Sequence, residues 1–299
     1  MAEPPIPWGA EALWQQLRAL LPGLSVEVLE RCVSTNSALL ERARVEVRPE
    51  SDNADVMVHR SVESAAFGRR AADAQPCLLV AEHQTGGRGR LGRSWQSAPG
   101  ASLTFSLSLP IARADWSGLS LVVGLALADA LEPRQGATPP RIGLKWPNDL
   151  WLMDGPAQGR KLGGILIETV AAGRTRLAVI GVGLNVMPMP AVEAGTGFAC
   201  LQELDPAASA PAALHRIALP LVQALHRFES EGFAAFAAGY AARDLLAGHP
   251  VRTTQQGLAE GIARGVDDGG ALRVQTGGGT MVSVTSGEVS VRLNADGST

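Results

Sequence analysis

Four predicted strands follow one another between residues 142 and 186, and this run constrains the fold more than any other feature of the chain. Each is a short apolar stretch bounded by turn residues, which is the pattern of a buried strand. The four segments are IGLKW (142–146), DLWLM (149–153), KLGGILIETV (161–170) and RLAVIGVGLNV (176–186).

Helices and further strands surround this run. Apolar periodicity and capping residues predict strands over 24–32, 76–84 and 102–110, and helices over 34–45, 116–132 and most of 211–247. Residues 46–76 are polar and lack apolar periodicity, so we predict a loop insertion there. The elements together predict an α/β (α+β) domain over residues 24–247, preceded by an N-terminal extension over residues 1–23.

The pattern of apolar and turn residues changes after Gly248. Short apolar segments alternate with glycine-rich turns through residues 248–299, which is typical of a small β-barrel of about 50 residues. We therefore predict a second, C-terminal domain over this range.

Composition excludes several classes of protein. The net charge of −3 gives no general polyanion-binding surface. Three cysteines, without a CxxC spacing, fit a reducing compartment, and five scattered histidines give no zinc motif. The N-terminus lacks the pattern of a signal peptide, and the most apolar stretch, residues 119–131, is too short to span a bilayer. We expect a soluble, cytoplasmic protein without a membrane partner.

The segment GGRGRLGRSW (86–95) has glycines at the spacing of a dinucleotide fingerprint. That fingerprint needs a helix after the glycines, because the helix N-terminus receives the pyrophosphate. A turn and another strand follow Gly92 instead, so the nicotinamide interpretation fails. The segment GPAQGRKL (155–162) fails as a phosphate loop, because its spacing is wrong and Leu162 replaces the hydroxyl residue.

Two interpretations of the glycine–arginine segment remain. Glycines let backbone N–H groups approach an anion, and Arg88, Arg90 and Arg93 supply bidentate donors to a carboxylate or phosphate. A solvated basic turn explains the same residues equally well.

Other blocks favour the anion site. Lys145, Asn148 and Asp149 surround a proline-containing turn, Lys161 begins a strand with two glycines, and Asn185 ends another strand. Each block alone has an ordinary structural explanation, such as turn chemistry or a β-bulge. Their joint presence in this order is not explained in that way.

The ordered series STN, GGRGRLGRSW, KWPNDL, RKLGGILIE, GVGLNV and SGEVSVR resembles biotin protein ligase, also called biotin–[acetyl-CoA-carboxylase] ligase. The resemblance covers most of residues 24–299. It implies a class II synthetase-like mixed sheet with helices packed on one face, followed by an SH3-like barrel. It also implies two half-reactions: biotin and ATP give biotinyl-5′-AMP and pyrophosphate, and a carrier lysine then takes the biotin and releases AMP.

The resemblance assigns residues to each role. Lys161, Arg90 and Lys145 are the expected catalytic cations. Biotin is expected at Ser34, Thr35, Asn36, Gln84, Gly87, Arg88, Arg90, Trp95, Lys161 and Gly163. ATP is expected at Arg88, Arg90, Arg93, Trp95, Lys145, Asn148, Asp149, Asn185 and Arg292, with Glu288 nearby. Mg²⁺ is expected to arrive with ATP, without a protein-only metal site.

The resemblance also implies a partner, a biotin carboxyl carrier domain such as that of acetyl-CoA carboxylase. Residues 8–23 predict one helix rather than a helix-turn-helix unit, so we expect no DNA binding and no repressor activity. Residues 161–170 can pair with a second copy, giving a homodimer, or with the carrier, and the sequence does not choose. Leu91 stands where relatives often have arginine, which lowers the charge of the loop.

Two competing functions remain at this point. Lipoate or octanoate ligases share the implied fold and adenylation chemistry, although the GRGRLGRSW and KWPND blocks together favour biotin. A non-catalytic nucleic-acid-binding module is more remote, because the loop is poor in aromatic residues and the net charge is negative.

Overall fold

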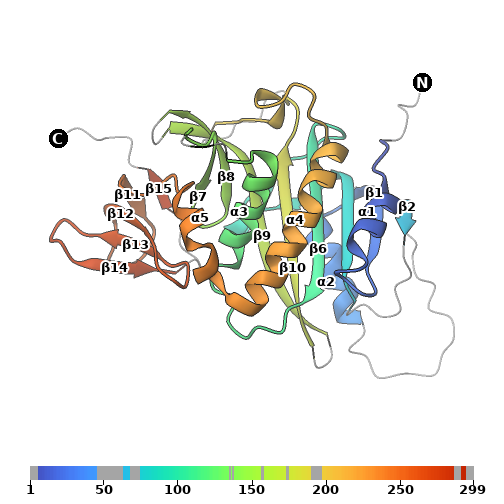
Figure 1. Ribbon diagram of the computed structural model, residues 1–299, viewed down its shortest axis with the longest axis horizontal. Helices are drawn as coiled ribbons and strands as arrows, with labels where there is room; N and C mark the ends of the chain where they lie inside the picture. Colours follow the sequence, from blue (N-terminus) through green and yellow to red (C-terminus); the bar gives the residue numbers. More distant parts are fainter. Residues whose placement is uncertain are drawn as a thin grey trace. The chain divides into compact units, whose positions relative to one another are not determined.

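The computed structural model describes residues 6–45, 63–67, 75–134, 136, 138–155, 158–172, 175–189, 197–285 and 291–293. The chain forms two compact units, and Figure 1 labels helices and strands of both. Unit 1 comprises Met1–Ala112, Ile165–Val192 and Cys200–Val222, and unit 2 comprises Arg113–Gly164, Glu193–Ala199 and Gln223–Thr299.

The larger sheet has the strand order β2-β1-β3-β6-β10-β9-β8-β7. β1 and β3 are parallel, whereas β1 with β2, β3 with β6, β6 with β10, β9 with β8 and β8 with β7 are antiparallel. The predicted mixed sheet is therefore confirmed. In sequence order, the strands are β1 (Ser25–Cys32), β2 (Glu63–Phe67), β3 (Cys77–Gln84), β6 (Ser102–Pro110), β7 (Ile142–Lys145), β8 (Asp149–Gly155), β9 (Gln158–Ala172) and β10 (Thr175–Asn185).

β2 lies inside the segment 46–76 that the sequence predicts as a loop. It pairs antiparallel with β1, so this part of the segment extends the sheet. Residues 46–62 and 68–74 lie outside the described residues. The sequence signal is weak because this five-residue strand, ESAAF, is mostly small and polar.

Strand β6 separates apolar from hydroxyl side chains. Alternation along the strand places Leu103, Phe105 and Leu107 on one face, and Thr104 and Ser106 on the other. All of them are buried. Gly183 and Gly181 of β10 lie opposite Thr104 and Ser106 in the antiparallel register. This face of unit 1 therefore combines buried hydroxyls with a glycine floor.

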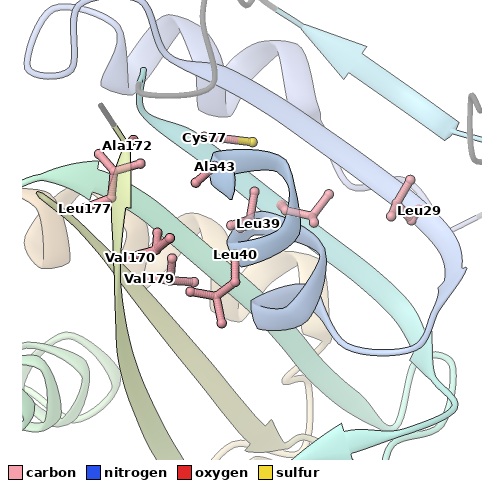
Figure 2. Packing of buried hydrophobic residues seen from close by; sticks show 10 residues of the cluster. Leu29, Leu39, Leu40, Ala43, Cys77, Val170, Ala172, Leu177 and Val179 are labelled. Carbon is pink, nitrogen blue, oxygen red and sulfur yellow. The ribbon is translucent and has the colours of Figure 1, made fainter. Parts of the chain in front are cut away.

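Helix α2 (Thr35–Val45) packs on the same face as those hydroxyls. Its Leu39, Leu40 and Ala43 form a buried cluster with residues that include Cys77 and Val179 (Figure 2). An ion pair adds to this apolar packing, since Arg42 of α2 pairs with Glu27 of β1 at 2.9 Å.

Helix α1 (Ala10–Leu17) contacts β1 and β2. The indole of Trp8, just before this helix, donates to Glu82 of β3, whose side chain lies on the face opposite to Cys77. Helices thus cover both faces of unit 1, and α2 is the addition to the expected one-sided arrangement. The described part of the predicted N-terminal extension is integrated into this packing, with Leu13 and Leu17 buried.

In unit 2, α3 (Leu119–Leu131) packs against β7 and β8. Arg243, only 2% exposed, holds the end of α3 on β7: it donates to Asp129, Glu132 and the carbonyl of Ile142. α4 (Ala210–Glu231) runs through both units, and η3 (Phe233–Phe236) and α5 (Ala237–Ala241) follow in unit 2.

The predicted C-terminal β module is an antiparallel five-stranded sheet in the order β14-β13-β12-β11-β15. Its strands are β11 (Pro250–Thr253), β12 (Glu260–Val266), β13 (Leu272–Gln275), β14 (Met281–Val284) and β15 (Val291–Leu293). Among the described residues, no helix has the length and apolar character needed to cross a membrane.

Candidate active site

The glycine–arginine segment forms a small hairpin. β4 (Gly87–Arg88) pairs with β5 (Ser94–Trp95), and a 3-10 turn over Arg90–Gly92 connects them. Leu91 adopts a left-handed backbone with φ 57°, which is uncommon for a residue with a side chain. A strand follows the glycines where a dinucleotide site would have a helix, so the structure agrees with rejecting that interpretation.

Trp95 lies on the glycine floor of β10. A Cβ atom on Gly183 would come within 2.4 Å of Trp95 Cε2, so only glycine leaves room for the indole at this distance. A Cβ on Gly87 would equally meet the carbonyl oxygen of Trp95 at 2.4 Å. Gly183 of GVGLNV and Gly87 of GGRGRLGRSW are therefore both required by packing around Trp95.

The STN segment begins α2 and enters a buried polar network. The backbone N–H and hydroxyl of Thr35 donate to Gln84 Oε1 at 2.8 and 3.2 Å. Ser106 Oγ lies 2.6 Å from both Thr35 Oγ1 and Asn36 Oδ1. Ser34 is buried before the helix, where its Oγ is 3.5 Å from the amide nitrogen of Ser37.

Glu168 of β9 connects this network to the hairpin. Its Oε2 accepts from Asn36 Nδ2 at 2.9 Å and from Arg88 Nη2 at 2.6 Å. Asn36 Nδ2 also donates to the carbonyl of Leu166. The amide of Asn36 thus bonds to three protein groups, and this indicates a role in holding the network. The contact of Asn36 with biotin stays a prediction.

Sequence reasoning misses Ser106 and Glu168. Ser106 belongs to the alternating segment SLTFSLSLP, whose pattern predicts only a half-buried strand. Glu168 ends the RKLGGILIE block, and the sequence assigns it no role. Both signals are visible in the sequence, but neither shows which element the side chain meets.

In unit 2, predicted cations gather around the turn between β7 and β8. Lys145 is 8% exposed, and its Nζ lies 4.6 Å from the ring centroid of Trp151. Lys161 Nζ pairs with Asp149 Oδ1 at 2.8 Å. Gly164 lies beside this pair, and Gly163 pairs with Leu150 in the sheet. Aromatic and carboxylate neighbours make both positive charges tolerable in a partly buried place.

The remaining predicted residues come from several elements of the two units. Asn185 is buried at the end of β10 opposite Ser102, and Asn148 is half-buried in the β7–β8 turn. Arg90 is half-buried and Arg93 is exposed in the hairpin. Arg292 is exposed on β15 opposite Arg252. Glu288 lies outside the described residues.

Two of the described cysteines, Cys32 and Cys200, do not have the lowered pKa of an activated nucleophile. All three are free thiols. Burial raises the pKa of Cys32 to about 11, against a smaller opposite effect from Arg42, and burial also raises the pKa of Cys200. A reactive cysteine needs a lowered pKa. In the part of the chain that the structure describes, no group of three or more His, Cys, Asp or Glu residues forms a potential metal site.

Comparisons with known proteins define the class first. The sequence model of the biotin/lipoate A/B protein ligase family matches residues 69–185. A model of the biotin protein ligase C terminal domain matches residues 248–292, which include the five-stranded sheet apart from its last residue. The class is therefore that of the biotin and lipoate ligases.

Similarity to individual proteins identifies the family within this class. The biotin–[acetyl-CoA-carboxylase] ligase of Mycobacterium tuberculosis is 37% identical over 80% of this chain and 85% of its own length. The bifunctional ligase/repressor BirA of Escherichia coli is 35% identical over 93% of this chain and 77% of its own. Biotin protein ligase from Aquifex aeolicus, solved with biotin and ATP, superposes with a TM-score of 0.67 at 25% identity, over 90% of this chain and 99% of that one. The chain belongs to the biotin protein ligase family, which confirms the predicted family, fold class and enzyme class.

Proposed function

We propose that this chain joins biotin to a lysine of a carrier domain in two half-reactions. A carboxylate oxygen of biotin attacks the α-phosphorus of ATP and displaces pyrophosphate. The amine of the carrier lysine then attacks the acyl carbon of biotinyl-5′-AMP and displaces AMP, with loss of a proton from the amine. Each step is an acyl or nucleotidyl transfer that requires no nucleophile from the enzyme.

The observation that carries the proposal is the buried network of Thr35, Asn36, Gln84 and Ser106 beside the glycines of β10. Neutral donors and acceptors on a floor of small residues suit an uncharged, polar ring system such as the ureido ring of biotin. Trp95 supplies an apolar wall for the attached chain. In our proposal these residues select the acid, together with Ser34 and Gly87.

The first half-reaction also needs positive charge, because the biotin carboxylate and the α-phosphate are both negative and repel one another as they approach. We assign Lys161 to the reacting oxygens, with its Nζ held by Asp149, and Lys145 to the phosphates. Asn148, Asn185, Arg93 and Arg292 are proposed contacts of the nucleotide. Arg88 and Arg90 are proposed to close the hairpin over the adenylate.

The oxygen ligands of the proposed site are too few to hold Mg²⁺ by themselves, so we propose that the ion binds together with ATP. Asp149 and Asn148 offer few oxygen ligands, and Mg²⁺ typically binds through one or two carboxylates together with substrate phosphates. When bound, the ion neutralises charge on the phosphates. Residues of this chain then orient the α-phosphate and hold the biotin carboxylate.

The partner in this proposal is a biotin carboxyl carrier domain, and the compartment is the cytoplasm, which the free thiols suit. Neither DNA binding nor a particular oligomer is part of the proposal. The integration of α1 with β1 and β2 supports a structural role for residues 6–23.

The decisive experiment is ATP–pyrophosphate exchange with Mg²⁺ and, in parallel, biotin, lipoate and octanoate. Exchange with biotin alone, followed by labelling of a carrier domain but not of its Lys→Arg variant, is the expected result. Exchange with lipoate or octanoate instead would show that the protein is a lipoate or octanoate ligase, which uses the same adenylation reaction. No exchange from folded protein would overturn the proposal.

A further inference from the structure

The turn between β7 and β8 is held by the C-terminal sheet. Trp146 follows Lys145, is 1% exposed, and donates its indole N–H to the carbonyl oxygen of Gly270 at 3.0 Å. Gly270 belongs to the connection between β12 and β13, within the same compact unit. A side chain next to a proposed catalytic lysine therefore rests on a backbone atom of the other sheet.

The β12–β13 turn, residues 267–271, is preformed for this contact. Asp267 Oδ1 accepts from the N–H groups of Gly269 and Ala271 at 3.0 and 2.9 Å. The N–H of Gly270 donates to the carbonyl of Asp267. Gly270 has φ +81°, a conformation that residues with side chains rarely adopt. The direction of its carbonyl is thus fixed by the turn itself.

Helix α3 supports the same place. A Cβ atom on Gly270 would lie 2.8 Å from the Cα of Gly118, immediately before α3, so the turn and the start of the helix are in close contact. Two residues further on, Ser120 donates its hydroxyl to the carbonyl of Pro147 at 2.7 Å. The β7–β8 turn therefore has two anchors, one through Trp146 and one through Pro147.

We propose that the β12–β13 turn is a positioning element for the adenylation site, acting through Trp146. This inference rests on the proposed function. Lys145 and Asp149 flank the held turn and pair with each other in the sheet, and Asp149 orients Lys161 Nζ at 2.8 Å. A displaced Gly270 carbonyl would shift these groups. Gly270 and Asp267 touch no substrate in this proposal, so their effect is indirect.

Gly270→Ala, with Gly279→Ala as its matched control, tests the proposal. Gly279 lies in the next turn, between β13 and β14, with φ +83° and no atom within 4 Å of the position that a Cβ would take. Both variants carry the same backbone strain, but only Gly270→Ala also pushes against Gly118. We expect Gly270→Ala to lose more stability than Gly279→Ala, because of the added contact with Gly118. At a temperature where both variants are folded, Gly270→Ala alone should lose about tenfold or more in kcat of pyrophosphate exchange. Its KM for biotin should change much less than kcat, because the proposed contacts with the biotin ring lie in unit 1.

Equal exchange rates in the two variants would overturn the inference while leaving the proposed function intact. No exchange in the unsubstituted protein would instead overturn the function. If Gly270→Ala does not fold, Asp267 gives a second test. Asp267→Asn keeps an acceptor for Gly269 and Ala271 and should retain kcat, whereas Asp267→Ala should lose it, and identical kcat in this pair would contradict the role of the turn.

Discussion

The two groups of proposed site residues use polarity in different ways. In unit 1, uncharged side chains such as Thr35, Asn36 and Ser106 are almost fully buried and bond to one another. In unit 2, Lys161 and Asp149 carry charges, and their side chains keep 26% and 17% of their exposure.

Solvation explains this difference. A buried amide or hydroxyl costs little once its hydrogen bonds are satisfied, whereas a buried ion needs a partner and still loses hydration. Neutral recognition can therefore be built into the sheet, and charge neutralisation stays where water reaches. If the proposed roles are right, mutations in unit 1 should affect selection of the acid, and mutations in unit 2 should affect activation of its carboxylate.

Lys161→Ala should give the largest effect. Removing the cation leaves the carboxylate and phosphate unscreened, and we expect kcat of pyrophosphate exchange to fall by about 10²–10³-fold. Biotin binding measured by calorimetry should weaken much less than kcat falls, since Lys161 is proposed to meet only the carboxylate and the proposed ring contacts are in unit 1. Asp154→Asn is the control, because it removes the exposed Arg160–Asp154 pair close by in sequence. Near-normal exchange in Lys161→Ala would break the comparison.

Gly181→Ala should affect the other side of the comparison. A Cβ there would lie 2.2 Å from Asn36 Oδ1, so the amide must leave Ser106 or shift α2. Loss of a satisfied buried bond costs about 1–3 kcal/mol, so we expect KM for biotin to rise by about 5–150-fold with a smaller change in kcat. Gly155→Ala, also in a strand but with only Gln158 nearby at 3.9 Å, should be nearly neutral. A fall in kcat alone would contradict this assignment.

Two neighbouring residues, Arg243 and Asp244, differ in whether a described group of opposite charge pairs with them. Arg243 has carboxylate partners, but Asp244 Oδ2 is buried and unbonded. Burial raises the pKa of Asp244 to about 6, against the opposing hydrogen bonds from Leu246 and Ala247. Because the folded state holds this proton more tightly than the unfolded state, stability decreases as the pH rises from about 4 to about 6.

Asp244→Asn should remove that decrease. At pH 7 we expect the variant to gain up to about 3 kcal/mol in free energy of unfolding, with no gain below about pH 4. Urea unfolding at pH 4, 5, 6 and 7 measures the difference. The same gain at every pH would mean that the carboxyl does not titrate as its burial implies.

The sequence predicted secondary-structure elements better than it predicted which side chains meet in the fold. Strand periodicity predicted most strands of the larger sheet, and the family resemblance implied that this sheet is mixed, which is confirmed. The hairpin was not predicted, because the glycine–arginine segment indicated only a loop, and the roles of Lys145 and Lys161 stay predictions. The partner of each side chain depends on register between distant strands, which periodicity does not contain. Glu168 and Ser106 were missed for this reason, as was β2, whose pairing with β1 outweighs its weak strand propensity.

Glu168→Gln should give the smallest effect and tests how separable the two functions are. Glutamine keeps an acceptor for Asn36 Nδ2 but loses the charge that holds Arg88 at 2.6 Å. The Arg88 side chain is 43% exposed, so solvent weakens this pair to about 1 kcal/mol, which corresponds to about a fivefold change. We expect that increase in the escape of biotinyl-5′-AMP, measured as labelling of a bystander protein relative to the carrier. Glu231→Gln is the control, because it removes the exposed pair with Arg227 on α4. A rise in KM for biotin with unchanged escape of the adenylate would mean that Glu168 acts mainly by holding Asn36 in the neutral network. Biotin recognition would then depend on the charge of this carboxylate, and the two functions would not be separable there.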